Sequence, residues 1–399
     1  MAEEEQLVLP IIDSHIHLCR TQDLDGLNWW KPDLPITPNG IFLPQFKHAA
    51  RSAPSLLGFV YVESGFKAHA DSPDGWALPL REVALMRRVA LGQPEAGDEG
   101  LEPEDAKLCL GLVPWAPLPS GPAVLEQYID RVREVAGEAW PKVKGFRYLA
   151  QDQPHGTMVQ KDFIEGLKLL GRRGLVFEVG VDHRRRGKKQ MDELVDMIDM
   201  THEGVPEEEK VTFVLSKFCP LPELSAPAFS PRVRPRPGKA NMATDHLCKP
   251  DLTIYNITSD PSFHNWRTAI YTLSKCSRTY MKLSGAFSEM PPALRVETPS
   301  HIFQSTLGWL GIVLATFGPS RIMFGSDWPV CTIDEPVKEK KEKKEGDDEE
   351  EEEEEEEPRG SDTWGRWRQV VEKMCWMATL SDEERAMIFG GTAKEAYGL

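Results

Sequence analysis

Long apolar runs, paired cysteines and an excess of basic residues are all missing from this chain of 399 residues. No apolar run reaches the roughly 18–20 residues that a membrane-spanning helix needs. The seven cysteines contain no C-x-x-C pair, which argues against a disulfide framework and against a zinc–thiolate site. The net charge of −16 argues against nucleic-acid and anionic-membrane partners. The acidic start, MAEEE, is unlike a signal peptide, so we expect a cytoplasmic protein with reduced cysteines.

The negative charge is concentrated in one segment. From Asp334 to Glu357, 24 residues carry 16 acidic and 5 basic side chains. Because such a segment cannot bury apolar surface, we expect residues 334–360 to form a disordered acidic loop. The chain as a whole is 40% hydrophobic and 9% aromatic, which is typical of a globular protein.

Short apolar runs alternate with longer amphipathic segments, a pattern typical of repeated β-α units around a parallel sheet. Eight runs are predicted strands: Pro10–Ile16, Leu57–Val62, Leu108–Val113, Val143–Tyr148, Leu175–Val181, Val211–Leu215, Tyr280–Leu283 and Arg321–Phe324. Helical spacing of apolar residues occurs in Leu80–Ala90, Ala123–Val135, Phe163–Arg172, Met191–Met200, Trp266–Cys276, His301–Phe317 and Trp364–Met377. We therefore predict a single-domain (β/α)8 TIM barrel over residues 8–399. An open doubly wound sheet is the alternative, but no glycine-rich phosphate loop follows the first run.

The first predicted strand ends in Asp13-Ser-His15-Ile-His17. Side chains alternate along a strand, so His15 and His17 point the same way, toward the C-terminal mouth of the barrel. Two imidazoles on one face provide half of a metal site. A bare H-x-H pair is often incidental, and its place at a strand end is what favours the ligand interpretation.

The eighth predicted strand ends in Phe324-Gly-Ser-Asp327-Trp-Pro. The first and last strands of a closed barrel are neighbours, which brings Asp327 beside the two histidines. A carboxylate there can ligate a metal or act as general base toward water. The alternative is that Asp327 only caps the segment that follows.

Five motifs occur in the order IIDSHIH, VKGFRYL, DHLCKPDL, YMKLSGAFSE and RIMFGSDWPV. Together they resemble the amidohydrolase-related family, and within it the branch of rhamnono-lactonases, fucono-lactonases and 2-pyrone-4,6-dicarboxylate lactonases, with fungal members the most similar. The resemblance covers nearly the whole chain. It implies a (β/α)8 hydrolase whose site lies at the C-terminal ends of the strands and which opens a sugar lactone with water.

The resemblance also implies roles for individual residues. It makes His15, His17, His246 and Asp327 the metal-ligand set, with Asp327 and His246 also catalytic. The expected metal is zinc or manganese, although metal-independent hydrolysis remains an alternative because a lactone is an activated ester. Asp327 would then take a proton from the attacking water.

Three further residues are predicted to bind substrate. Arg147, in GFRYL, matches the arginine that the family points at its substrate, and a guanidinium suits a carboxylate or a developing oxyanion. Lys249, in HLCKP, and Glu63, at the end of the second predicted strand, are the other two. Each has a structural alternative, since all three can serve in ordinary ion pairs.

Two more polar residues follow or lie within the fifth predicted strand. Glu178 either reaches the pocket or forms an inward salt bridge. His183, in the basic stretch DHRRRGKK, is expected in a solvated turn.

A proline-rich segment, residues 216–244, separates the sixth strand VTFVL from DHLCKPDL, whereas the family pattern joins them. It is either a natural low-order insertion or a translated intron. Codons for Ser216-Lys217, Ala240-Asn241 and Thr244-Asp245 can contain a splice donor, a branch point and an acceptor in that order. A cDNA that retains these nucleotides in the translated message would contradict the intron hypothesis.

The sequence therefore predicts a sugar-lactone hydrolase whose partner is a small-molecule lactone. One alternative is a zinc-dependent non-oxidative decarboxylase of an aromatic or enoic acid. A second is a non-catalytic scaffold whose acidic loop binds a basic partner. The particular sugar and the oligomeric state are not determined by the sequence.

Overall fold

The computed structural model describes residues 9–31, 41–53, 55–69, 73–216, 250–254, 257–332 and 362–399. The strands in these ranges form two parallel sheets, with strand orders β1-β2-β3 and β4-β5-β6-β7-β8. Their bounds are β1 Ile11–Ile16, β2 Leu56–Val62, β3 Cys109–Val113, β4 Gly145–Leu149, β5 Val176–Gly180, β6 Phe213–Ser216, β7 Thr279–Leu283 and β8 Ile322–Phe324. All eight predicted strands are confirmed to within two residues at each end.

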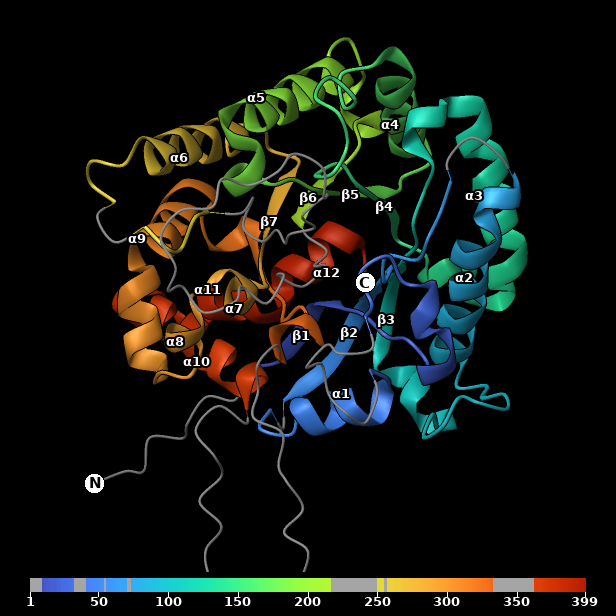
Figure 1. The fold of residues 1–399 in the computed structure, drawn as a ribbon, viewed down its shortest axis with the longest axis horizontal. Helices are drawn as coiled ribbons and strands as arrows, with labels where there is room; N and C mark the ends of the chain where they lie inside the picture. The colour runs from blue at the N-terminus through green and yellow to red at the C-terminus, as the bar shows by residue number, and fades with distance from the viewer. Residues whose placement is uncertain are drawn as a thin grey trace, which may run out of the picture.

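Helices connect successive strands and lie around them (Figure 1). Their bounds are α1 Leu43–Ala49, α2 Ala77–Leu91, α3 Pro122–Ala136, α4 Lys161–Arg172, α5 His183–His202, α6 Pro261–Leu273, α7 Ala286–Glu289, α8 Pro292–Arg295, α9 Pro299–Phe317, α10 Thr363–Met377, α11 Asp382–Ala386 and α12 Thr392–Tyr397. The seven predicted helices are confirmed as α2 to α6, α9 and α10. Side-chain caps that accept backbone N–H bonds start several of them, among them Asp260 on α6 and Thr298 on α9.

Isolated parallel bridges link the two sheets to each other. Leu112 pairs with Val143, which joins the end of β3 to the chain that enters β4. At the other side, Ile16 of β1 pairs with Trp328, four residues beyond β8. The first and last strands of the chain are therefore neighbours, as the sequence predicted.

The two faces of the strands pack differently. Outward side chains such as Phe177 and Val179 of β5 belong to the large core between strands and helices. The alternate side chains form an inner cluster, which consists of Ile12, Val60, Val62, Val113, Val176, Val214, Met323, Ala393, Ala396 and Tyr397. Full burial of each Val or Ile contributes roughly 1.5–3 kcal/mol. The last three residues come from α12, so the C-terminal helix contributes to this cluster.

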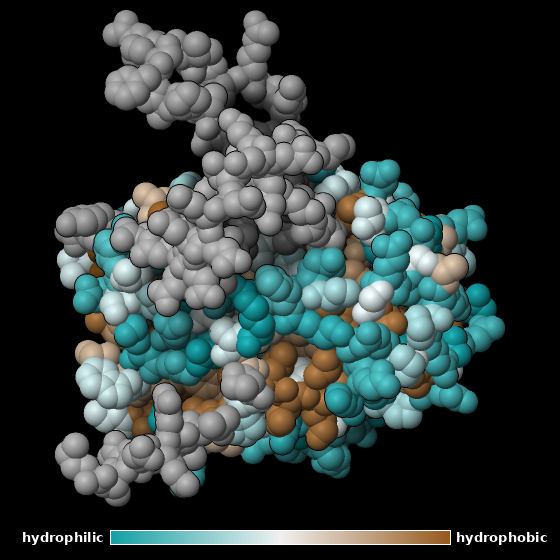
Figure 2. Space-filling view, turned by 90° about the horizontal axis from the view of Figure 1, so that it is seen from below, coloured by the Kyte–Doolittle hydropathy of each residue, from teal (hydrophilic) through white to brown (hydrophobic). Residues whose placement is uncertain are grey.

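The surface of the molecule is more polar than its interior. Figure 2 shows one face, on which hydrophilic residues are the more numerous and the largest apolar area lies in the lower half of the view. Among the helices that the structure describes, none is both long and apolar enough to cross a membrane. Of the five cysteines in the described ranges, four are buried and all five are free thiols. The remainder of the proline-rich segment beyond Ser216, and the acidic segment 334–360, lie outside the described residues.

Candidate active site

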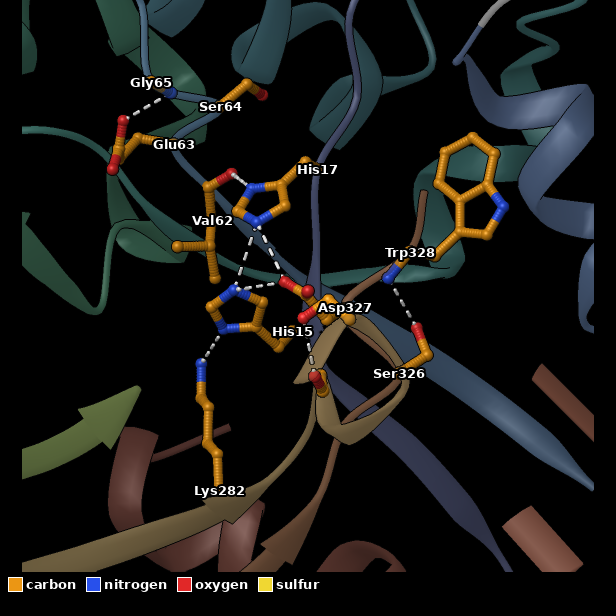
Figure 3. Close-up of polar contacts among 12 residues, drawn as sticks. His15, His17, Val62, Glu63, Ser64, Gly65, Lys282, Ser326, Asp327 and Trp328 are labelled. Atoms are coloured by element: carbon orange, nitrogen blue, oxygen red, sulfur yellow. Dashed lines mark hydrogen bonds and ion pairs between the residues drawn. The ribbon is translucent and has the colours of Figure 1, made fainter. Parts of the chain in front are cut away.

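His15, His17 and Asp327 meet where β1 and β8 end, and all three side chains are fully buried (Figure 3). Nε2 of His15 lies 3.1 Å from Nε2 of His17. Oδ1 of Asp327 lies 3.4 Å from each of these two nitrogens. Within the described part of the chain, this is the one group of three His, Cys, Asp or Glu residues with ligand-like spacing.

Local backbone irregularities bring the two segments together. The pairing of β1 with β2 shifts register between Asp13 and Ile16, and such an irregularity re-aims the side chains that follow it. Asp327 has a φ of 61°, which is uncommon for a residue other than glycine. Its N–H donates to the carbonyl of His15 at 2.9 Å, and the N–H of His17 donates to the carbonyl of Trp328 at 2.8 Å. These two backbone hydrogen bonds hold Asp327 beside both histidines.

Asp13 stabilises the contact between β1 and the chain after β8 through hydrogen bonds. Its carboxylate accepts bonds from the backbone N–H of Ser326 at 2.8 Å and from that of His15 at 3.2 Å. The indole N–H of Trp364, on α10, donates to the other carboxylate oxygen at 2.8 Å. Burial raises the pKa of Asp13, and these hydrogen bonds oppose that shift. The residue therefore ties β1, the chain after β8 and α10 together.

Each imidazole has a defined partner on its far side. Nδ1 of His17 lies 3.1 Å from the carbonyl of Val62, so Nδ1 carries the proton and Nε2 presents its lone pair. Nδ1 of His15 lies 3.0 Å from Nζ of Lys282 and 3.8 Å from Oε2 of Glu178. A lysine ammonium has donors only, so without a bound metal Nδ1 of His15 accepts and the proton of the neutral ring lies at Nε2. The 3.1 Å contact between the two histidines is then a complementary hydrogen bond. A metal bound at Nε2 of His15 would take the place of that proton.

Lys282, on β7, and Glu178, on β5, form a buried ion pair with 2.8 Å between Nζ and Oε1. Burial lowers the pKa of Lys282 to about 8, although the charge of Glu178 opposes the shift. Burial by itself would raise the pKa of Glu178, but the charges of Lys282 and Arg147 bring it below its ordinary value. Glu178 therefore does both things that the sequence allowed, since it forms a salt bridge and reaches the site.

The spacing of the three donor atoms suits a tetrahedral metal. Ligand atoms placed roughly 2.0–2.1 Å from zinc lie about 3.4 Å from one another. The measured separations are 3.1, 3.4 and 3.4 Å. The contact of His17 with Val62 is of the kind that orients a metal-ligating histidine. His15, His17 and Asp327 therefore fit a divalent metal, and the same geometry fits a hydrogen-bonded cluster without one.

Arg147 and Glu63 are both buried and lie against each other. Nη1 of Arg147, on β4, is 3.4 Å from Oε1 of Glu63 and 3.4 Å from its carbonyl oxygen. Glu63 follows β2 and also accepts a bond from the N–H of Gly65 at 2.7 Å. Burial lowers the pKa of Arg147, while the nearby charges of Glu63, Glu178 and Asp327 act to raise it. The structure thus joins two predicted substrate-binding residues in one ion pair close to Asp327.

His183 differs from its prediction. It is the first residue of α5 and is 2% exposed, so the expected solvated turn is wrong. The arginines after it form ion pairs with acidic side chains, for example Arg185 with Asp152 at 3.1 Å. These pairs let a basic segment fold as a helix that begins with a buried residue. Burial lowers the pKa of His183, and neither ring nitrogen has a hydrogen-bond partner among the described residues.

His246 and Lys249 lie outside the described residues. Lys282, which belongs to the motif YMKLSGAFSE, and Tyr397 are site neighbours that were not predicted. Lys282 stands two residues after Tyr280 in a predicted strand, so strand periodicity could have placed it on the inward face. Tyr397 lies in the last helix, and nothing in the local sequence connects it to β5.

A buried His-His-Asp cluster at the ends of parallel strands is typical of α/β hydrolytic enzymes with metal sites. The model of the amidohydrolase family matches residues 110–399, and the chain belongs to this family.

Two sequence relatives and one solved structure illustrate the similarity. The chain is 26% identical to an L-rhamnono-gamma-lactonase from Scheffersomyces stipitis, with 98% of each chain covered. It is 31% identical to an L-fucono-1,5-lactonase from Burkholderia multivorans over 40% of this chain and 43% of that one. An amidohydrolase from Burkholderia multivorans, solved with bound zinc, superposes with a TM-score of 0.60 at 22% identity over 98% of this chain and 99% of that one. The last likeness shows a shared fold.

Proposed function

We propose that this protein hydrolyses a sugar lactone by attack of water on the lactone carbonyl. The observation that carries the proposal is the buried cluster of His15, His17 and Asp327, in which a carboxylate and two imidazoles face a common point. The names of the two sequence relatives, a rhamnono-lactonase and a fucono-lactonase, support the substrate class. An aldonolactone such as L-rhamnono-1,4-lactone is the substrate we propose to test first.

The proposal includes a closed (β/α)8 barrel in one domain, with insertions at residues 216–244 and 334–360. The bridges of Leu112 with Val143 and of Ile16 with Trp328 support closure, because they lie at the two joints between the sheets. In such a barrel the site lies at the C-terminal mouth, where His17 and Asp327 follow their strands.

In the proposed reaction Asp327 accepts a proton from water as its oxygen attacks the carbonyl carbon. The bond between that carbon and the ring oxygen then breaks, and Asp327 returns the proton it took from water to the ring oxygen, which gives a hydroxy acid. His15 and His17 lie beside the carboxylate of Asp327 and orient the water. A divalent metal held by these three residues, with His246 as a further ligand, would polarise the carbonyl and acidify the water. Zinc and manganese suit this donor set.

Arg147 is proposed to bind the lactone carbonyl and its developing oxyanion. The ion pair with Glu63 holds the guanidinium in place, since Nη1 contacts both the carboxylate and the carbonyl of that residue. Glu63 thus acts on substrate through Arg147. Lys249 remains a proposed substrate-binding residue on the resemblance alone.

The rival decarboxylase is not favoured, because the two sequence relatives that carry names are both lactonases. The test is a panel of aldonolactones and aromatic acids given to the purified protein. We expect proton release from at least one lactone in a pH-stat and no carbon dioxide from the acids. Carbon dioxide release without lactone opening would overturn the proposal. The absence of product in both assays would favour the alternative of a non-catalytic scaffold protein.

A further inference from the structure

The C-terminal helix α12 is drawn among the strands in Figure 1, and three of its residues belong to the inner cluster of strand side chains. Ala393, Ala396 and Tyr397 pack against valines of β2, β3, β5 and β6 in the inner cluster. Tyr397 is 4% exposed, so its ring is held by these neighbours. The helix therefore carries a tyrosine hydroxyl to the inward face of the sheet.

The Tyr397 hydroxyl contacts the buried polar residues next to His15. Tyr397 donates its O–H to Oε1 of Glu178. The same oxygen accepts a bond from Nζ of Lys282 at 2.8 Å, and Nζ lies 3.0 Å from Nδ1 of His15. Nζ also lies 5.4 Å from the centre of the Tyr397 ring, within the range of a cation–π contact. A continuous chain of contacts thus runs from the C-terminal helix to the site.

The burial of this chain makes each contact costly to lose. Glu178, Lys282 and His15 are all 0% exposed. A buried carboxylate needs donors for its lone pairs, and leaving one unmet is unfavourable. With the Tyr397 hydroxyl in place, Oε1 of Glu178 is fixed between two donors, and Lys282 is fixed between Glu178 and His15.

We propose that Tyr397 is a positioning residue of the site, which acts through Glu178 and Lys282 to fix the orientation of the His15 ring. The catalytic consequence rests on the proposed lactonase function. The structural consequence does not, because it concerns the His15 ring in the protein as purified. Tyr397 itself has no role as a catalytic residue.

The test is Tyr397→Phe, which keeps the ring and its packing and removes only the hydroxyl. Tyr280→Phe is the matched control, because Tyr280 packs against the same inner cluster from β7 but has no contact with Glu178 in the described structure. Glu178→Gln tests the next contact in the chain. Lactone hydrolysis gives kcat and KM, and nitrogen-15 spectra of histidine-labelled protein report the surroundings of the His15 ring, with His15→Gln to assign the signal.

For Glu178→Gln we expect a loss in kcat of roughly 10–100-fold, the range for outer-shell partners of a site, and for Tyr397→Phe about tenfold. KM should stay near the wild-type value in both. The His15 signal should shift and broaden in both variants, because the ring is no longer held in one orientation. Tyr280→Phe should leave kcat and the signal unchanged.

An unchanged kcat and His15 signal in Tyr397→Phe would overturn the proposal and leave the residue a purely packing role. An equal loss of kcat in Tyr280→Phe would contradict it too, because the effect would then follow the inner cluster and not the hydroxyl. If the wild-type protein opens no lactone, the proposed function fails, and the nitrogen-15 signal still decides whether Tyr397 fixes His15.

Discussion

Asp13 and Asp327 are two fully buried carboxylates that flank the same junction between β1 and the chain after β8, yet their surroundings differ. Asp13 accepts bonds from two backbone N–H groups and one indole N–H. Oδ1 of Asp327 faces the ring nitrogens of two histidines, which are groups that can gain, lose or share a proton. Burial alone therefore does not identify a reactive carboxylate, and the partners do.

The surroundings of Glu63 share features with those of both Asp13 and Asp327. Its carboxylate contacts a guanidinium, which carries a permanent charge, and a backbone N–H. We therefore expect Asp13 to matter for stability, Asp327 for catalysis, and Glu63 for both.

The largest effect is expected for Asp327→Asn. An amide cannot accept the proton of water, so lactone hydrolysis should fall by roughly 10²–10⁴-fold, the usual contribution of a general base. Thermal unfolding should stay close to wild type, since the backbone bonds of this residue are retained. Initial rates of proton release and a melting curve on the same preparation check both points. A rate near wild type would refute the assigned role.

Glu63→Gln and its matched variant Arg147→Met should give the next largest effects. The amide still accepts the N–H of Gly65 but no longer balances the charge of Arg147, so kcat/KM should fall roughly 10–100-fold. Arg147→Met, as the matched variant, removes the oxyanion contact directly and should cost roughly 10²–10³-fold in kcat. If Glu63→Gln has no effect while Arg147→Met abolishes turnover, the ion pair does not hold the guanidinium.

Asp13→Asn should act on stability. The amide of asparagine can satisfy the backbone donors or the indole of Trp364, but not all of them, which leaves a buried donor unmet at a cost of about 1–3 kcal/mol. Urea unfolding followed by tryptophan fluorescence measures the difference. An unchanged free energy of unfolding would show that these three hydrogen bonds make no net contribution to stability.

The smallest effect is expected at Gly325, in the segment between β8 and Asp327. An added Cβ would lie 3.1 Å from Cβ of His15 and 3.0 Å from Oγ of Ser14. Gly325→Ala should therefore cost about 1 kcal/mol, at the low end for overpacking. Gly311→Ala in α9 is the control, because a Cβ there meets nothing within 4 Å, and it should not destabilise the protein. Equal effects on urea unfolding would argue against crowding at His15.

The comparison also shows what a sequence can predict. Strand periodicity located β1 and β8, and the adjacency of first and last strands then brought His15, His17 and Asp327 together. Those inferences are local, apart from one rule of topology. The contact of Tyr397 with Glu178 joins residues far apart in the chain, and it depends on where α12 docks, which no local pattern encodes. His183 was mispredicted because the arginines that follow it pair with acidic residues distant in sequence, Arg184 with Glu289 and Arg185 with Asp152, which no local pattern reveals.

The most direct test of the account is the rate of proton release from one aldonolactone by Asp13→Asn and Asp327→Asn, measured side by side at a temperature where both are folded. The account predicts that Asp13→Asn keeps most of the wild-type rate and that Asp327→Asn loses at least about 100-fold. Equal losses in the two variants would contradict it, because the two carboxylates would then share one role.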